Sequence, residues 1–296
     1  MQVIALVNQK GGCGKTTAAI HMGAALARAG SRVLLVDLDP QAHATLGLGC
    51  EGEGAPALHE VLSAGVPARD ALRAAPAGMT LLPASPRLAE FEETSNQALA
   101  PESRLRRALA PLAREFDHVV LDCPPRADGV LTANALATCT LATLVVETGA
   151  FALQGALRAL ALLGEVARAQ GSRFDVRVLA TLFDRRTRFE REVLIALQAR
   201  FGRAMFETAI RRDVRLREAV AHGVPVQEFA PRCHASLDFA ALARELGEYT
   251  PTEGRALSEE DAALPDHAGP ELALVRSAEA PAAPRGGPRE PFQPSL

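Results

Sequence analysis

The chain has 296 residues, of which 48% are apolar and 23% charged, an ordinary usage for a folded protein that excludes disorder throughout. The formal net charge of −3 gives no evidence for or against a nucleic-acid partner. The sequence contains no run of 18 apolar residues, so it predicts no transmembrane helix. Of the 32 basic residues only two are lysines, Lys10 and Lys15, and both lie near the N-terminus. Arginine-rich codon usage explains the many arginines but not the position of these two lysines.

Apolar runs alternate with helical patterns along most of the chain. The runs predict strands at 2–8, 32–39, 79–85, 118–125, 143–148, 176–183 and 204–210. The patterns predict helices from about 16 to a C-cap at Gly30, then over 86–115 with a break at Pro101, and over 130–139, 153–171, 188–201 and 236–248. Residues 47–57 are predicted as a glycine-rich loop. Strands that alternate with helices predict an α/β fold, with a mostly parallel, twisted sheet and helices on both faces.

The composition changes after about Tyr249. Residues 250–296 are rich in proline and alanine and carry eight acidic residues against four arginines, with no sustained apolar period. We therefore expect one domain over 1–249 and a disordered acidic tail, which lacks the basic amphipathic helix that docks on membranes. The five cysteines are scattered without a metal-binding spacing, and the N-terminus has no signal-peptide pattern. These features predict a reducing, cytoplasmic location.

A glycine-rich segment separates the first predicted strand from the first helix. It reads Gln9-Lys10-Gly11-Gly12-Cys13-Gly14-Lys15-Thr16-Thr17. Its glycines let backbone N–H groups converge on an anion, and the helix N-terminus adds its dipole. The pattern predicts a phosphate-binding loop in which Lys15 reaches the β- and γ-phosphates of a nucleotide and Thr16 holds Mg²⁺. The loop is a variant, because Gln9 replaces the usual first glycine and Lys10 adds a lysine at the outer wall of the phosphate cradle.

Three aspartates close apolar strands. Asp37, Asp39 and Asp122 fall at the strand ends where parallel α/β sheets bind ligands. Aspartates in that position also serve simply as helix caps. Beside a phosphate loop, we expect Asp39 and Asp122 to be functional and Asp37 to be mainly structural.

Several segments resemble one family of ATPases. The segment K-G-G-C-G-K-T resembles the deviant Walker A motif of the ParA/Soj and MinD ATPases. RVLLVDLDPQAHATLGLG resembles the second acidic motif of the ParA family, and FDHVVLDCPP resembles its Walker B motif. LFDRRT and IRRDVRLREA resemble its late segments that contact DNA and the base. The resemblance covers about residues 1–249 and implies a short ParA-like partition ATPase with no DNA-binding domain before the loop.

The resemblance also implies roles for individual residues. The catalytic residues would be Lys10, Lys15 and Asp39: Lys10 would cross a dimer interface to the partner's phosphates, and Asp39 would position or activate the attacking water. Thr16 and Asp122 would bind Mg²⁺, the latter through water. ATP would be held by Lys10, Gly11, Gly12, Cys13, Gly14, Lys15, Thr16 and Thr17, with Arg211 and Asp213 near the base. These last two stand where the family usually has proline and asparagine, a departure that bears on base recognition.

The stretch between Thr181 and Leu216 is basic. It holds nine arginines against five acidic residues, a local excess of +4. Such a cluster suits salt-dependent, sequence-independent contacts with DNA phosphates. The alternative is a solvated helix face with i,i+4 ion pairs, for example between Glu190 and Arg186. The resemblance favours DNA binding, through Arg185, Arg186, Arg188, Arg212 and Arg215.

Together these features predict a cytoplasmic, nucleoid-associated Mg²⁺-ATPase. It would dimerise on ATP, bind double-stranded DNA without sequence specificity, and release it after slow hydrolysis stimulated by a ParB-like adaptor. We expect no membrane partner. Three alternatives stay open: a MinD-like ATPase for another cargo or a membrane, an iron–sulfur ATPase that uses Cys123 and Cys139, and a nucleotide-binding scaffold with little turnover.

Overall fold

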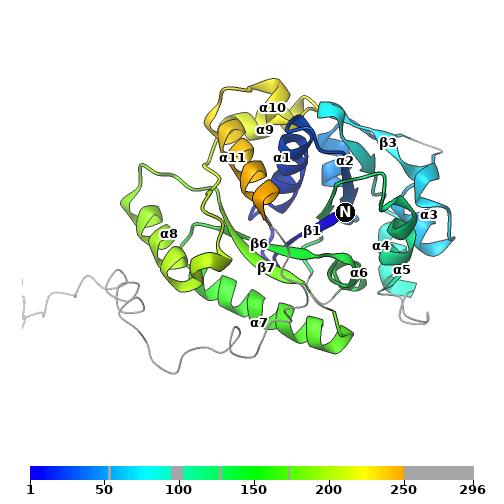
Figure 1. The fold of residues 1–296 in the computed structure, drawn as a ribbon, viewed down its shortest axis with the longest axis horizontal. Helices are drawn as coiled ribbons and strands as arrows, with labels where there is room; N and C mark the ends of the chain where they lie inside the picture. The colour runs from blue at the N-terminus through cyan, green and yellow to red at the C-terminus, as the bar shows by residue number, and fades with distance from the viewer. Residues whose placement is uncertain (53–54, 95–102, 127–128, 173, 250–296) are drawn as a thin grey trace, which may run out of the picture. The chain divides into compact units, whose positions relative to one another are not determined.

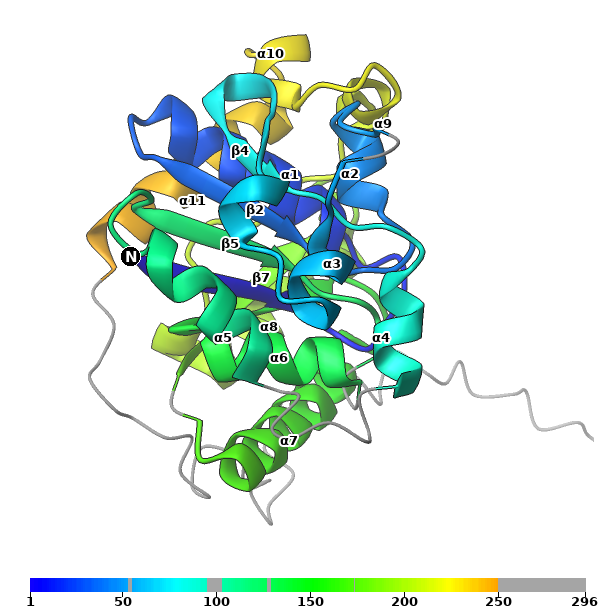
Figure 2. The same cartoon turned by 90° about the vertical axis from the view of Figure 1, so that its right-hand side faces the viewer.

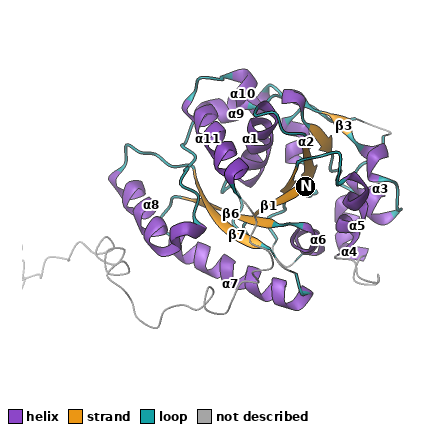
Figure 3. Ribbon diagram, viewed as in Figure 1, coloured by secondary structure: helices purple, strands orange, loops and turns teal. Residues whose placement is uncertain are grey.

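A seven-stranded sheet forms the centre of the protein (Figure 3). The computed structural model describes residues 1–52, 55–94, 103–126, 129–172 and 174–249. The strand order is β3-β4-β2-β5-β1-β6-β7, and neighbours are parallel except for β3 and β4. The strands are β1 (Gln2–Val7), β2 (Val33–Asp37), β3 (Arg73–Ala74), β4 (Thr80–Leu82), β5 (His118–Asp122), β6 (Leu141–Glu147) and β7 (Asp175–Thr181). The prediction of a mostly parallel α/β sheet is confirmed.

Helices cover both faces of this sheet (Figures 1 and 2). On one face lie α3 (Leu58–Ser63), α4 (Leu88–Thr94), α5 (Arg104–Leu109), α6 (Val130–Thr138), α7 (Ala152–Gln170) and α8 (Arg188–Phe201). On the other lie α1 (Lys15–Arg28), α2 (His43–Gly47), α9 (Val214–Ala221), α10 (Val226–Phe229) and α11 (His234–Glu248). Short 3₁₀ turns are η1 (Ala68–Ala71), η2 (Pro76–Gly78), η5 (Ala110–Leu112) and η6 (Gly202–Ala204).

The two layers follow from the alternation of side chains along each strand. In β1, Val3, Ala5 and Val7 belong to the core under α3 to α8, whereas Ile4 and Leu6 belong to the core under α1 and α11. All five side chains are almost fully buried. Since both faces are covered, the strands are continuous apolar runs, which is why they stand out in the sequence.

Most predicted elements are present with shifted ends, and one is wrong. Residues 204–210 do not form a strand: Met205 makes a single bridge with Val178 of β7. The amides of Glu207 and Thr208 donate instead to the carboxylate of Glu245 on α11, at 2.7 and 3.0 Å. The amides of Phe206 and Ile210 donate to the β7 carbonyls of Val178 and Ala180 at 2.9 and 2.8 Å. Because Glu245 takes the amide of Thr208 between them, the segment runs along β7 without a continuous ladder.

The remaining differences are local. The helix expected over 86–115 is divided into α4 and α5, and the break expected at Pro101 lies outside the described residues. The acidic tail at 250–296 also lies outside them. Helix α1 ends as expected, because Gly30 follows it with a φ of +97°, in the left-handed region that favours glycine.

Candidate functional site

The loop of residues 8–14 joins the central strand β1 to helix α1. Gly12 and Gly14 have φ values of +75° and +95°, which L side chains rarely adopt. A Cβ placed on Gly11 or Gly12 would meet no atom within 4 Å, so open space lies over the loop. The first turn of α1 adds N–H groups without intrahelical partners. The loop therefore forms an open cradle suited to an anion such as a phosphate.

The two lysines of the loop have different surroundings. Lys15 is only 6% exposed, and its ammonium lies 3.4 Å from the carbonyl oxygen of Lys10, within the loop itself. Lys10 is exposed, and its ammonium forms an ion pair with the carboxylate of Glu147 at the end of β6. Lys15 is thus an inner cation of the cradle and Lys10 an outer one, as the sequence predicts.

Polar side chains fix the loop to the neighbouring strands. The Thr181 hydroxyl, at the end of β7, donates to the carbonyl oxygen of Cys13 at 2.7 Å. The Asn8 amide donates to the carbonyl of Val145 at 2.7 Å, and its oxygen accepts from the backbone N–H of Lys10 at 3.0 Å. Cys13 is fully buried, and burial raises the pKa of its thiol, so it acts as a packed side chain.

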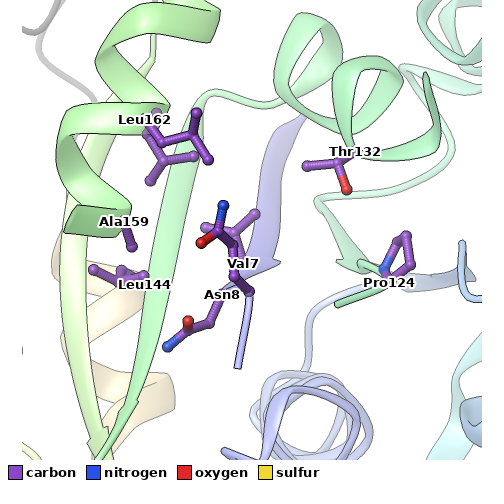
Figure 4. Close-up of a pocket in the computed structure, with 9 residues that line it drawn as sticks. Val7, Asn8, Pro124, Thr132, Leu144, Ala159 and Leu162 are labelled. Atoms are coloured by element: carbon purple, nitrogen blue, oxygen red, sulfur yellow. The ribbon is translucent and has the colours of Figure 1, made fainter. Parts of the chain in front are cut away.

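A small cavity lies beside the start of the loop, among Val7, Asn8, Thr132 of α6 and Leu162 of α7 (Figure 4). Its walls are mostly apolar, and it has room for about one water molecule. It is therefore too small for a nucleotide, and the open side of the glycine loop is the place for the phosphates.

Two buried carboxylates lie at the end of adjacent strands. Asp37 of β2 and Asp122 of β5 are direct neighbours in the sheet, and both are fully buried. Among the described parts of the chain, no group donates a hydrogen bond of normal geometry to either oxygen of Asp122. Burial, with a smaller effect from the Asp37 charge, raises the pKa of Asp122 well above its usual value, although the Thr16 hydroxyl opposes the shift. A buried carboxylate without partners, next to a threonine, fits a magnesium ion bound through water.

Asp37 and Asp39 have distinct environments. Asp37 accepts from both the backbone N–H and the hydroxyl of Thr45 at 2.8 Å, while burial raises its pKa to about 6. This pairing agrees with the structural role expected for Asp37. Asp39 is 8% exposed and accepts from the backbone N–H of Gln41 at 2.9 Å. Among the residues that the structure describes, its second oxygen, Oδ2, accepts no hydrogen bond, so Asp39 keeps an acceptor for a water molecule.

Arg211 and Asp213 are both engaged by the protein. The Arg211 guanidinium binds Asp238 of α11 through Nε, at 3.1 and 2.9 Å from the two carboxylate oxygens, and this pair raises the Arg211 pKa. Asp213 caps α9 by accepting from the N–H of Arg215 at 3.0 Å. The structure thus holds both side chains within the α9–α11 region, and any contact with a base must coexist with these partners.

The basic segment is assembled from two neighbouring loops. The N–H of Phe183 donates to the carbonyl of Ile210 at 3.1 Å, and the N–H of Arg212 donates to the carbonyl of Phe183 at 2.9 Å. These bonds place the start of α8 beside the start of α9. All the predicted DNA-binding arginines are exposed: Arg185, Arg186, Arg188, Arg212 and Arg215.

One ion pair expected in this segment is absent, although Arg188 and Glu192 form another i,i+4 pair at 2.7 Å. Arg186 binds Asp184, not Glu190, and the hydrogen bonds from Arg186 hold the pKa of Asp184 well below its usual range. Glu190 accepts from the Thr148 hydroxyl at 3.0 Å and from the N–H of Asp184 at 2.6 Å. The expected i,i+4 pair of Glu190 with Arg186 is therefore wrong, because the loop before α8 needs the Glu190 carboxylate for its own backbone.

Four polar residues contribute to the site although no sequence motif identifies them: Asn8, Glu147, Thr181 and Glu190. Each contacts a segment more than 40 positions away. The one available signal was position, since Asn8, Glu147 and Thr181 stand at the ends of predicted strands.

Two alternatives can be weighed against the geometry. Cys123 and Cys139 are 1% and 5% exposed, and burial raises the pKa of both thiols, which does not suit a cluster shared across a subunit surface. In the part of the chain that the structure describes, no group of three or more metal-ligating side chains is found. No helix in that part is long and apolar enough to cross a membrane.

The parallel sheet, the glycine loop after its central strand and the paired lysines define a P-loop nucleotide-binding protein. The family model described as an AAA domain matches residues 1–176. Soj of Thermus thermophilus, a chromosome-partitioning ATPase, is 41% identical over 244 residues, covering 82% of this chain and 94% of that protein. The sporulation initiation inhibitor protein Soj of Bacillus subtilis is 35% identical over 248 residues, covering 83% and 98%.

A solved structure agrees with these relatives. Cobyrinic acid a,c-diamide synthase from Mycobacterium smegmatis, with bound ADP and magnesium, has 33% identity and a TM-score of 0.73, covering 85% of this chain and 98% of that one. The chain belongs to the ParA/Soj family of P-loop ATPases.

Proposed function

We propose that this protein is a Mg²⁺-dependent ATPase that dimerises on ATP, binds DNA without sequence specificity and segregates DNA. The observation that carries the proposal is the division of the loop between a buried inner lysine, Lys15, and an exposed outer lysine, Lys10. An outer lysine is not needed to hold phosphates within one chain. It suits the phosphates of a second copy that faces the loop.

The residues present fit a magnesium-bound ATP. The cradle is open where a Cβ on Gly11 or Gly12 would stand, and Asp122 offers two oxygens without partners. Thr16 and Asp122 would hold the ion, and residues 10–17 would hold the phosphates. When bound, Mg²⁺–ATP supplies the transferable γ-phosphoryl group and a metal charge that offsets the phosphate charge.

The chain's own groups then act by position and charge. Lys15 places a positive charge on the inner side of the cradle, and Lys10 adds one from the facing copy. Asp39, nearly buried and hydrogen-bonded through its N–H to Asp37, would orient the attacking water through its carboxylate. None of these groups forms a bond to the phosphoryl group, so they would act by positioning and charge alone. We expect slow turnover that an adaptor protein accelerates.

The DNA contact is proposed for the exposed arginines at the starts of α8 and α9. Their excess charge attracts phosphates, and a dimer presents two such surfaces, which strengthens weak contacts. A partner of the ParB type and a cytoplasmic, nucleoid-associated location follow from this role. The Soj relatives support it, because the Thermus thermophilus protein is a chromosome-partitioning ATPase.

The test is DNA binding with ATP, ADP or no nucleotide. Wild type should bind only with ATP, and Lys10→Ala should lose the ATP-dependent binding. Equal DNA binding with ATP, with ADP and without nucleotide would contradict the proposal. ATP hydrolysis, measured on the same samples, distinguishes the proposed ATPase from a scaffold with little turnover. For the ATPase, Asp39→Ala should lower hydrolysis while ATP-dependent DNA binding persists.

A charge-matched pair of variants tests the arginine surface. Arg186→Glu with Arg212→Glu should abolish ATP-dependent DNA binding. Arg28→Glu with Arg106→Glu, two exposed arginines on α1 and α5, makes the same change in net charge and should leave binding within about threefold of wild type. Equal losses in both variants would mean that overall charge, and not this surface, governs binding.

A further inference from the structure

The ammonium of Lys10 is held by a carboxylate of its own chain. It pairs with Glu147, the last residue of β6, and the side chains are 62% and 27% exposed. Asn8 ties the same two segments through the backbone, accepting from the N–H of Lys10 at 3.0 Å and donating to the carbonyl of Val145 at 2.7 Å. The backbone of Lys10 is therefore fixed by neutral hydrogen bonds, while its ammonium is held by an ion pair that another anion can reach.

Glu147 acts on Lys10 and not on the inner lysine. Among the residues that the structure describes, Lys10 is the one cation within 4.0 Å of the Glu147 carboxylate. Lys15 is buried and directed to the carbonyl of Lys10. A change at Glu147 consequently alters the outer cation of the cradle and leaves the inner one in place.

We infer that Glu147 is a positioning residue for Lys10. It keeps the ammonium on its own chain until the phosphates of a nucleoside triphosphate in a second copy compete for it. The inference rests on the proposed function, in which Lys10 reaches across a dimer. Since the triphosphate carries more negative charge than one carboxylate, the exchange favours the nucleotide-bound dimer, and Glu147 raises the nucleotide occupancy needed for association.

The size of the effect follows from the exposure of the pair. An exposed ion pair changes an equilibrium by about 1.5- to 5-fold. A dimer must release two such pairs, one from each copy, so their combined effect on the association constant is about 2- to 30-fold.

The first test reads the ion pair without nucleotide. The chain contains two lysines, so acetylation by an amine-reactive reagent, followed by mass spectrometry, gives the rate at Lys10 relative to Lys15. Glu147→Gln should raise this ratio severalfold. The matched control is Glu115→Gln, which removes the partner of Arg69 from a pair of similar exposure, 64% and 34%, and should not change the ratio. An unchanged ratio in Glu147→Gln overturns the inference.

The second test measures association by sedimentation with Mg²⁺ and increasing ATP. Glu147→Gln should associate about 2- to 30-fold more tightly than wild type, and Glu115→Gln should match wild type. Lys10→Ala should fail to associate, and adding Glu147→Gln to it should not restore association. If wild type fails to associate with ATP, the proposed function fails and this role with it. If wild type associates and Glu147→Gln is equal or weaker, this role alone is rejected.

Discussion

His21 makes the stability of this protein depend on pH in a way that can be calculated. Its side chain is fully buried on α1, beneath the ring of Phe239 at 5.4 Å, and its Nδ1 accepts from the N–H of Val226 at 3.1 Å. Burial lowers its pKa from 6.5 to about 3. The folded protein therefore keeps His21 neutral at pH values where the unfolded chain protonates it.

The sign and size follow from this difference. The contribution of His21 to the free energy of unfolding is complete above pH 6.5. It is lost as the pH falls, by about 1.4 kcal/mol per pH unit, until the pKa of His21 in the folded protein is reached. Between pH 7 and pH 5 the loss is about 2 kcal/mol. The pKa of Asp37, raised to about 6, acts in the opposite direction, since a carboxyl group that binds its proton more tightly when folded adds stability as the pH falls.

Comparison of two proteins separates these effects. His21→Gln keeps an acceptor for the Val226 N–H but does not titrate, whereas Asp37 is common to both proteins. Urea unfolding at pH 7.0, 6.0 and 5.0 should show the advantage of wild type over His21→Gln shrinking by about 2 kcal/mol. Phe239→Leu, which weakens packing on the same ring, should shift stability by a similar amount at each pH. If the two unfolding curves stay parallel across this range, the burial argument is refuted.

Three further outcomes follow from the site. Thr181→Val leaves the carbonyl of Cys13 without its donor, so we expect a loss of about 1–2 kcal/mol in unfolding free energy and weaker ATP binding by calorimetry. Asp122→Asn removes a buried charge, so it should raise the melting temperature of the nucleotide-free protein while lowering Mg²⁺-dependent ATPase activity about 10- to 100-fold. Asp238→Asn weakens the charged hydrogen bonds of Arg211 and should cost about 1.5–3 kcal/mol in urea unfolding.

Each of these three predictions has a control variant or a result that would contradict it. Thr17→Val, at a half-buried position in the first turn of α1, should change ATP binding without an equal loss of stability. A lower melting temperature for Asp122→Asn would mean that its carboxylate has a stabilising partner. Glu192→Gln removes the exposed partner of Arg188 and should cost no more than about 1 kcal/mol, so an equal loss for Asp238→Asn would show that its burial adds nothing.

The sequence predicts what is encoded locally. The central strands are recognisable as apolar runs because both faces of the sheet are covered. The glycine loop is recognisable from the spacing of its glycines and lysines alone. The meeting of Asp37 with Asp122 depends on strand order, which the sequence does not state. The partners Glu147 and Thr181 are single polar residues whose importance depends on which strand lies beside β1.

The prediction of a strand at residues 204–210 is wrong for the same reason, because the structure of this segment depends on a contact from a distant part of the chain. Their apolar alternation is typical of a strand, but the carboxylate of Glu245 on α11 accepts from the amides of Glu207 and Thr208 and interrupts the ladder to β7. A pattern reports what a segment can do in isolation. It does not report that a side chain 37 or 38 residues away competes for the hydrogen bonds of that segment.

The order of the strands distributes local stability unevenly. Strand β1, which carries the glycine loop, is hydrogen-bonded on both sides, to β5 and β6. Strand β7, which leads to the arginine segment, has a full ladder on one side only and an isolated bridge between Val178 and Met205 on the other. Edge strands open at lower free energy than central ones. Partial unfolding can therefore loosen the arginine segment while the phosphate loop stays formed, so that one surface adapts its shape and the other keeps it.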